Sequence, residues 1–156
     1  VVAITGIHAQ VLLGIVERVF AAFRERAEKR GITLHTAVPG DLTVRADPRA
    51  LEQILTNLVD NAVKYAAEKT EVAVEAKRDG DVVRIVVADT GPGIAPTHVP
   101  HIFERFYRVD AGRSRELGGT GLGLSIVKNL TEAMGGAVAV ESQVGAFTRF
   151  SVTLPS

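Results

Sequence analysis

Four short segments follow one another in order along this chain of 156 residues and constrain its fold and chemistry more than any other feature. They span residues 57–65, 89–94, 103–108 and 118–124. The first carries amides and a lysine, the second starts with a carboxylate and turns on glycines, the third alternates aromatics with arginines, and the fourth is glycine-rich. Each is weak evidence alone. Their order and spacing predict one pocket for a purine, its phosphates and a metal ion.

The composition fits one globular domain and argues against several functions. Apolar residues make up 46% of the chain, and 18 basic residues balance 18 acidic ones, so no net charge favours nucleic acid or an anionic membrane. The absence of cysteine excludes disulfides and thiolate metal sites. No apolar run approaches the roughly 20 residues that cross a bilayer. Because the chain begins without Met or a charged leader, we expect an excised fragment whose membrane anchor lies outside it.

Apolar periodicity and turn signals predict the elements. We expect helices over about residues 10–30 and 122–134, and another that starts at Pro48 with Asp47 as its N-cap. Strands are expected near residues 32–38, 71–78, 82–89, 137–141 and 147–154, with a hairpin signal at Asp79-Gly80. Only a short helix near residues 97–103 is expected between residues 91 and 121, and residues 105–120 are typical of a lid or binding loop.

Strands clustered beside helices indicate an α+β fold. We expect a two-layer sandwich in which three main helices cover one face of a mixed sheet. No repeat or domain boundary follows residue 10, so residues 10–156 are predicted to form one domain and residues 1–9 a linker.

Asn57, Asn61 and Lys64 lie on one predicted helical face, at positions i, i+4 and i+7. An amide oxygen suits Mg²⁺ that takes its other ligands from phosphates and water, and a lysine supplies charge to the same phosphates. Tyr65 offers a ring to a base. The alternative interpretation is a solvated polar face.

Asp89 ends an apolar strand where a glycine turn begins. A carboxylate there can accept a hydrogen bond from an exocyclic amine such as adenine N6, and Gly91 and Gly93 allow the backbone to approach a ligand. The alternative is an ordinary Asp-x-Gly turn.

Glycines at positions 118, 119, 121 and 123 lead directly into the last helix. Unpaired N–H groups and the positive end of a helix dipole make such a start a phosphate site. A dinucleotide-binding fingerprint requires a strand immediately before the glycines, and none is predicted here. A Walker A loop ends in Gly-Lys-Ser/Thr, which this segment lacks. The alternative is a flexible hinge.

The third segment supplies aromatic and cationic side chains. We expect Phe103 and Phe106 to clamp the loop base onto the core. Of Arg105, Arg108, Arg113 and Arg115, Arg108 is the preferred contact to a γ-phosphate. The four histidines show no metal-ligand spacing and are interpreted as surface or packing residues, and no nucleophile–histidine–acid arrangement is present.

In this order, the segments resemble the N box, first glycine box, F box and second glycine box of the catalytic ATP-binding domain of sensor histidine kinases. That domain belongs to the GHKL ATPases, with DNA gyrase, a heat-shock chaperone and a mismatch-repair protein. The resemblance covers about residues 10–155. It implies a Bergerat fold, with a mixed, mostly antiparallel sheet and an ATP lid, and ATP and Mg²⁺ as cofactors.

The resemblance also implies roles for individual residues. Those expected at the nucleotide are Asn57, Asn61, Lys64, Tyr65, Asp89, Gly91, Gly93, Ile94, Tyr107, Arg108, Gly119, Thr120, Gly121, Leu122, Gly123, Leu124 and Thr148. Catalytic roles are expected for Asn61, which would bind Mg²⁺, for Lys64 at the phosphates and for Arg108 at the γ-phosphate. Asp89 would accept from adenine N6, with Thr148 on the strand behind the base.

Two departures accompany the resemblance. Phe147 stands where the family usually has glycine. None of the histidines is followed by the Glu/Asp-Leu-Arg/Lys-x-x-Pro pattern of the phosphoacceptor helix, so that helix is absent from this chain. Residues 1–9 are interpreted as a linker remnant from a missing dimerisation domain. The expected function is to bind Mg-ATP and donate the γ-phosphoryl group to a histidine on that separate domain, for onward signalling to a response regulator. We expect a monomeric fragment from the cytoplasmic part of a membrane-anchored kinase.

Three other functions remain open from the sequence. A serine-kinase anti-sigma factor would share the fold, but the F box and the arginine-bearing loop argue against it. An ATPase clamp would need a transducer domain for which 156 residues leave no room. A regulatory module that binds nucleotide without transfer has no support in the sequence and needs an assay to exclude it.

Overall fold

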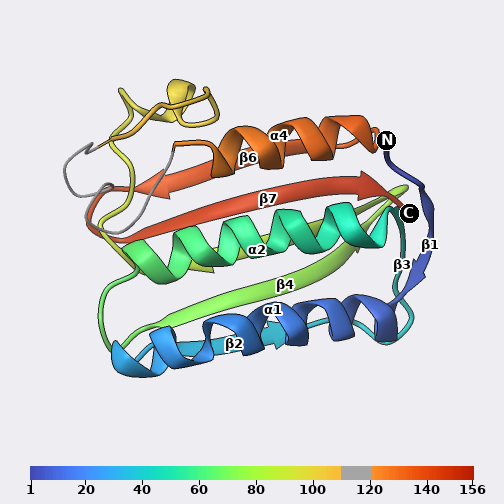
Figure 1. Ribbon diagram of the computed structural model, residues 1–156, viewed down its shortest axis with the longest axis horizontal. Helices are drawn as coiled ribbons and strands as arrows, with labels where there is room; N and C mark the ends of the chain where they lie inside the picture. The colour runs from blue at the N-terminus through green and yellow to red at the C-terminus, as the bar shows by residue number, and fades with distance from the viewer. Residues whose placement is uncertain (110–120) are drawn as a thin grey trace.

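The computed structural model describes residues 1–109 and 121–156 and shows two layers, a five-stranded sheet and helices packed on one of its faces (Figure 1). The strands are β2 (Thr33–Ala37), β4 (Glu71–Asp79), β5 (Val82–Asp89), β7 (Phe147–Pro155) and β6 (Ala137–Gln143), in that spatial order. β2 and β4 are parallel and the other neighbours are antiparallel. The predicted α+β fold with a mixed, mostly antiparallel sheet is confirmed.

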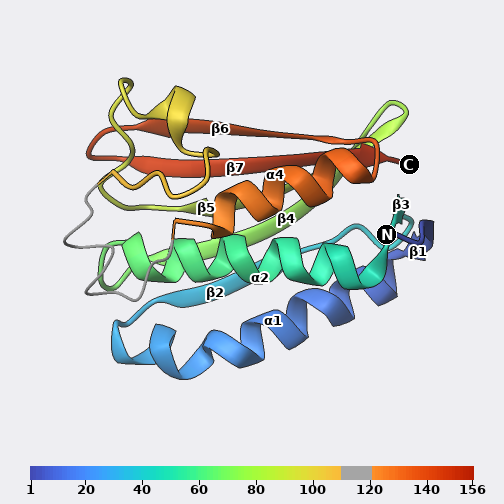
Figure 2. The ribbon, with the colours of Figure 1, turned by 45° about the horizontal axis from the view of Figure 1, so that its top comes forward.

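Three helices cover the sheet in the described residues: α1 (Ala9–Lys29), α2 (Pro48–Tyr65) and α4 (Gly123–Ala133). α2 lies between the other two and packs on both (Figure 2). Its apolar stripe is completely buried, and so are the inward residues of β5 and β7 that face the helical layer. Because each buried leucine or isoleucine contributes about 1.5–3 kcal/mol, this central contact stabilises the domain substantially.

The predicted start of α2 is confirmed in detail. The Asp47 carboxylate accepts hydrogen bonds from the Arg49 amide at 2.8 Å and the Ala50 amide at 3.3 Å, and Pro48 occupies the first helical position. The same carboxylate accepts a hydrogen bond from the Ala3 amide at 2.7 Å. These backbone donors hold the pKa of Asp47 below its usual value. The N-terminal residues are thereby attached to the start of the central helix.

A second, two-stranded sheet was not predicted. β1 (Thr5–His8) pairs antiparallel with β3 (Thr43–Ala46) beside the N-terminal end of α1. Ile7 in β1 and Val44 in β3 are buried in the common core. Four of the residues interpreted as a linker therefore form a strand packed on the domain. The short helix expected near residues 97–103 is a single 3-10 turn, η1 (Val99–His101).

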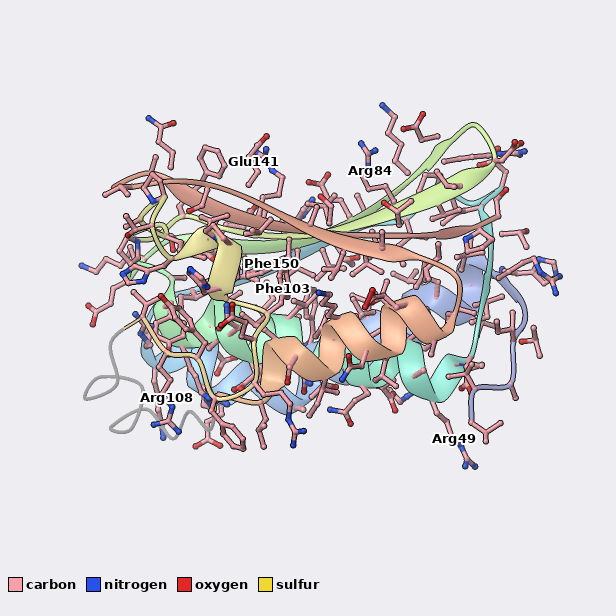
Figure 3. All side chains as sticks on the ribbon, turned by 90° about the horizontal axis from the view of Figure 1, so that it is seen from above. Arg49, Arg84, Phe103, Arg108, Glu141 and Phe150 are labelled. Atoms are coloured by element: carbon pink, nitrogen blue, oxygen red, sulfur yellow. The ribbon has the colours of Figure 1, made fainter. Side chains whose placement is uncertain are left out.

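In residues 1–109 and 121–156, the helices all lie on one face of the sheet and leave the other face uncovered. Figure 3 shows Arg84 of β5 and Glu141 of β6 on this face, opposite the helical layer. Small side chains such as Ala73 and Ala88, which pair across β4 and β5, lie between such charged residues. Within residues 1–109 and 121–156, no helix combines the length and hydropathy of a membrane span.

One end of the sandwich collects the ends of several elements. α2 ends there at Tyr65, β5 ends at Asp89, and α4 begins at Gly123, at the left of Figure 1. The loop of residues 90–109 lies over the same end. The fold therefore gathers all four sequence segments, so far as they are described, in one place.

Candidate functional site

A cleft of about 610 Å³ opens at this end of the domain. The residues predicted from the sequence that line it are Asn57, Asn61, Lys64, Tyr65, Asp89, Gly93, Ile94, Tyr107, Arg108, Gly121, Leu122, Gly123, Leu124 and Thr148. Gly91 does not line it, and Gly119 and Thr120 lie outside the described residues. Lining residues that sequence reasoning missed are Asp60, Pro92, Ile102, Val109 and Ile126.

Asp89 is the buried acid at the base of the cleft. It is 6% exposed and pairs across β5 and β7 with Thr148, which is equally buried. Burial raises the pKa of the Asp89 carboxyl group from 3.8 to about 7. Across residues 1–109 and 121–156, no hydrogen bond or ion pair to this carboxylate is present. A buried carboxylate of this kind is costly until a ligand supplies a donor.

The turn after Asp89 is held against the hairpin between β6 and β7. The Ile94 amide donates to the Ser142 hydroxyl at 2.7 Å, and the Ser142 oxygen lies 3.2 Å from the Thr148 hydroxyl. Gly93 has φ +72°, and a Cβ there would lie 2.9 Å from the Val144 Cα, too close for any side chain. These contacts set the floor of the cleft beside Asp89.

The departure at Phe147 leaves this hairpin intact. The positive φ of the turn falls on Gly145, at +77°, and Phe147 is the first residue of β7. The Gly145 amide donates to the Pro92 carbonyl at 2.8 Å. Thr148 consequently keeps its place opposite Asp89.

Gly91 lies behind the cleft, packed between the end of α2 and Asp89. A Cβ there would lie 2.8 Å from the Tyr65 carbonyl oxygen and 2.9 Å from an Asp89 carboxylate oxygen. The neighbouring Thr90 carbonyl accepts a hydrogen bond from the Ala67 amide at 2.8 Å. The missing side chain of Gly91 lets the end of β5 and the end of α2 lie against each other.

The cleft-facing side of α2 carries the predicted amides and lysine, with Asp60 among them. The Asn57 amide group donates to the Gly123 carbonyl at 3.2 Å, which attaches α2 to the start of α4. The Lys64 ammonium group lies 3.0 Å from the Asp60 carboxylate. Asp60 lies at i+3 from Asn57, so helical spacing alone was enough to place it on this face.

Arg30 fixes the end of α2 from behind. Its guanidinium group donates to the carbonyls of Val63, Lys64 (3.1 Å) and Ala66 (2.5 Å). These carbonyls have no helical partner of their own, and a cation at the helix C-terminus also complements the helix dipole. The position of the last turn, which carries Lys64, therefore depends on the end of α1.

The start of α4 and the third segment meet backbone to backbone. The Phe106 amide donates to the Gly121 carbonyl at 2.7 Å, and a Cβ on Gly121 would lie 2.7 Å from the Phe106 Cα. Gly123 then begins α4, whose first N–H groups have no helical partner. The positive end of this helix dipole faces the cleft and suits an anion.

Only one of the two clamping phenylalanines acts as predicted. Phe103 packs edge-to-face on Phe150 of β7, with ring centroids 6.0 Å apart (Figure 3). The prediction for Phe106 is wrong, because this residue is 65% exposed, with the Arg105 guanidinium group 5.6 Å from its ring centroid. Its φ is +66°. The loop base is thus attached through Phe103 and through the Phe106 backbone.

Two histidines hold the tyrosine of the same segment. The Tyr107 hydroxyl lies 2.5 Å from His98 Nδ1, and the His101 ring lies 5.4 Å from the Tyr107 ring. This packing role agrees with the sequence interpretation. Arg108 follows, lines the cleft and extends away from the sheet (Figure 3). Arg113 and Arg115 lie outside the described residues.

The described residues fit a purine nucleotide with a divalent metal. The buried acceptor Asp89 lies in the same cleft as the apolar side chains Ile94 and Ile102, which suit a base. Lys64 and the start of α4 suit phosphates. No group of three or more His, Asp or Glu in the described part of the chain forms a metal cage. Asn61 lines the cleft, and one amide oxygen suits Mg²⁺ that keeps water and phosphate ligands.

Comparison with known proteins places the cleft in a family. A family model described as histidine kinase-, DNA gyrase B-, and HSP90-like ATPase matches residues 46–156. The sensor protein SrrB of Staphylococcus aureus is 35% identical over 148 residues, which are 95% of this chain and 25% of SrrB. The chain thus spans about a quarter of the length of the curated relatives it matches.

Solved structures agree over nearly the whole chain. Full-length ShkA in complex with AMPPNP is 36% identical with a TM-score of 0.82, over 99% of this chain and 31% of ShkA. The catalytic domain of the histidine kinase ThkA is 28% identical with a TM-score of 0.81, over 98% of this chain and 95% of that one. ThkA in complex with the response regulator protein TrrA is 26% identical with a TM-score of 0.77, over 97% of this chain and 41% of that one.

Proposed function

This chain belongs to the histidine kinase-, DNA gyrase B-, and HSP90-like ATPase family, and on that premise we propose that its cleft binds Mg-ATP as the catalytic domain of a sensor histidine kinase. The domain would donate the γ-phosphoryl group of ATP to a histidine on a separate dimerisation domain. The observation that carries the proposal is the buried Asp89 carboxylate, which has no donor among the described residues and lies at the base of the cleft.

Asp89 supplies selectivity for the base. An adenine presents an amine donor at N6, whereas a guanine presents a carbonyl oxygen at the equivalent position. A donor to the carboxylate favours its ionised form and lowers its raised pKa, so amine binding relieves the cost of burial. A purine without that donor leaves the carboxylate unpaired, which typically costs several orders of magnitude in affinity or rate.

Lys64, Arg108 and the first turn of α4 supply the charge that the phosphates need. Lys64 acts as a point charge, and the N–H groups at Gly123 and the following residues present the positive end of a helix dipole. Asn61 would hold Mg²⁺, which when bound neutralises phosphate charge and orients the reacting group. Arg108 lines the cleft from the loop of residues 90–109 and would contact the outermost phosphate.

The transfer itself asks mainly for positioning and charge stabilisation. The bond between the γ-phosphorus and its bridging oxygen breaks, a new bond forms to a histidine nitrogen, and ADP leaves. In this chain Asp89 fixes the base end, and Lys64 with Arg108 neutralises charge at the phosphate end. A nitrogen entering in line on the open side of the cleft completes the reaction.

The acceptor and later partners belong to the longer protein that we propose. SrrB, a sensor protein about four times the length matched here, supports a parent kinase with further domains. The ThkA structure with its response regulator supports onward transfer to such a protein. We place the domain in the cytoplasm of a membrane-anchored kinase, and as an isolated fragment we expect it to be monomeric.

Calorimetric titration tests the nucleotide site directly. We expect saturable binding of ADP and AMPPNP to wild type, tighter with Mg²⁺ than without it, and no saturable binding of GDP. Asp89→Asn keeps the shape but presents an amide, and should abolish ADP binding. Asp81→Asn removes the same charge at an exposed hairpin position and is the matched control. If folded wild type binds no adenine nucleotide, the proposal is wrong.

Transfer is tested separately. Purified domain, radiolabelled ATP and Mg²⁺ are mixed with a sensor-kinase dimerisation domain, and acid-labile label on its histidine is measured. Label that appears with wild type and is lost with Asn61→Ala supports phosphoryl transfer. Tight binding of ATP without transfer to any acceptor domain would favour the regulatory, non-catalytic alternative.

A further inference from the structure

Asp60 occupies an unusual place on the cleft-facing side of α2, between cations from two helices. One carboxylate oxygen lies 3.0 Å from the Lys64 ammonium group in the same helix. The other lies 3.0 Å from the Arg26 guanidinium group of α1. Lys64 is the least exposed of the three side chains, at 15%, against 32% for Asp60 and 46% for Arg26. A chain of alternating charge therefore runs from the surface of α1 to the cleft.

Both oxygens of the Asp60 carboxylate are engaged by cations, so the group is not arranged to bind a metal ion. One of the three ammonium protons of Lys64 points to Asp60, which leaves two for a ligand. We propose that Asp60 is a positioning residue that determines how much of the Lys64 charge reaches the phosphates of a bound nucleotide. This inference rests on the proposed nucleotide site.

The sign of the effect follows from the charges. Asp60 holds the ammonium group in the cleft wall but also places a negative charge beside a polyphosphate, which opposes binding. Arg26 offsets that charge from the far side. Removing the Asp60 charge should therefore tighten phosphate binding, and removing the Arg26 charge should weaken it.

A second ion pair between α1 and α2 provides a matched control. Arg18 of α1 and Glu52 of α2 form an ion pair at 2.8 Å with the same sequence separation, 34 residues, as Arg26 and Asp60. Arg18 lies eight residues before Arg26, and Glu52 lies eight residues before Asp60. Neither Arg18 nor Glu52 lines the nucleotide cleft. The two pairs therefore attach α1 to α2 in the same way, but only one continues to a cleft lysine.

The experiment measures ADP and adenosine affinity by calorimetry, in low and high salt, for wild type and four variants. We expect Asp60→Asn to tighten ADP binding by about three- to tenfold in low salt, because a partly exposed charge close to a phosphate has an effect of that order. Arg26→Gln should weaken ADP binding, and adenosine affinity should not change in either variant. High salt should reduce both effects.

The controls Glu52→Gln and Arg18→Gln should bind ADP as wild type does. Thermal unfolding of every variant confirms that it is folded and reports the cost of each lost helix–helix pair. If Asp60→Asn binds ADP no more tightly than Glu52→Gln does, or if it changes adenosine affinity equally, the inference is overturned. If wild type binds no ADP, the proposed function fails instead.

Discussion

Replacing Asp89 with asparagine should stabilise the nucleotide-free domain at neutral and alkaline pH, even though it removes the nucleotide site. Burial raises the pKa of Asp89 from 3.8 to about 7 in the folded domain. Folded Asp89 therefore binds its proton more tightly than the unfolded chain does, so wild-type stability falls as pH rises from about 4 to about 7. The asparagine variant has no such proton to lose.

The magnitude follows from the shift. A change of about 3 pKa units at about 1.4 kcal/mol for each unit gives about 4 kcal/mol above pH 7, and less at lower pH. For a domain of this size that free energy corresponds to a rise in Tm of about 10 °C. Below about pH 3 this contribution should vanish, because Asp89 is then protonated in both the folded and the unfolded state.

Urea unfolding of both proteins between pH 4.5 and 9 provides the assay, and only their difference matters because other titrating groups are shared. The difference in free energy of unfolding should grow with pH and level off above about 7. A difference that is constant across this range would show that the Asp89 charge carries no folding cost, and would refute the argument. Saturating ADP should stabilise wild type alone.

Three further substitutions test other parts of the site. Gly93→Ala places a side chain against the Val144 backbone at positive φ, and should lower the free energy of unfolding, measured by urea titration, by about 2–4 kcal/mol. A smaller loss would mean that the hairpin moves freely. Phe103→Ala should lower both Tm and ADP affinity, whereas the exposed Phe106→Ala should leave Tm within about 1 °C; equal losses would contradict the clamp. Arg30→Ala should lower the free energy of unfolding by about 2–3 kcal/mol and weaken ADP binding, and Arg30→Lys should restore part of both. Unchanged ADP affinity by calorimetry would show that the end of α2 does not influence the site.

The sequence predicted those elements that a few neighbouring residues specify, such as α2 and the hairpin between β4 and β5. The Asp47-Pro48 cap and the apolar stripe of α2 specify that helix within one segment, and the Asp79-Gly80 step specifies the hairpin. The pairing of β1 with β3 joins four-residue strands far apart in the chain, and no turn signal connects them. Pairing of that kind depends on the packed core, so local patterns did not reveal it.

The site followed the same division. Glycines and polar residues at motif positions were predicted because their types are chemically specific, whereas apolar lining residues such as Ile102 and Ile126 have types that any core shares. Asp60 was missed because a charged residue on a helix usually faces solvent. Phe106 was expected to be buried from its residue type, but its backbone, not its ring, makes the contact with Gly121.

The uncovered face of the sheet makes the domain easy to attach to a surface without obstructing the cleft. The chain has no cysteine, so one introduced thiol would be the single reactive sulfhydryl on the protein. Arg84 and Glu141 lie on the face away from the helices, and their side chains are half or more exposed (Figure 3). A cysteine substituted at either position would allow oriented immobilisation or single-dye labelling, with nucleotide access unchanged. The same geometry would let a binding sensor be built on this scaffold by labelling one face while the ligand enters elsewhere.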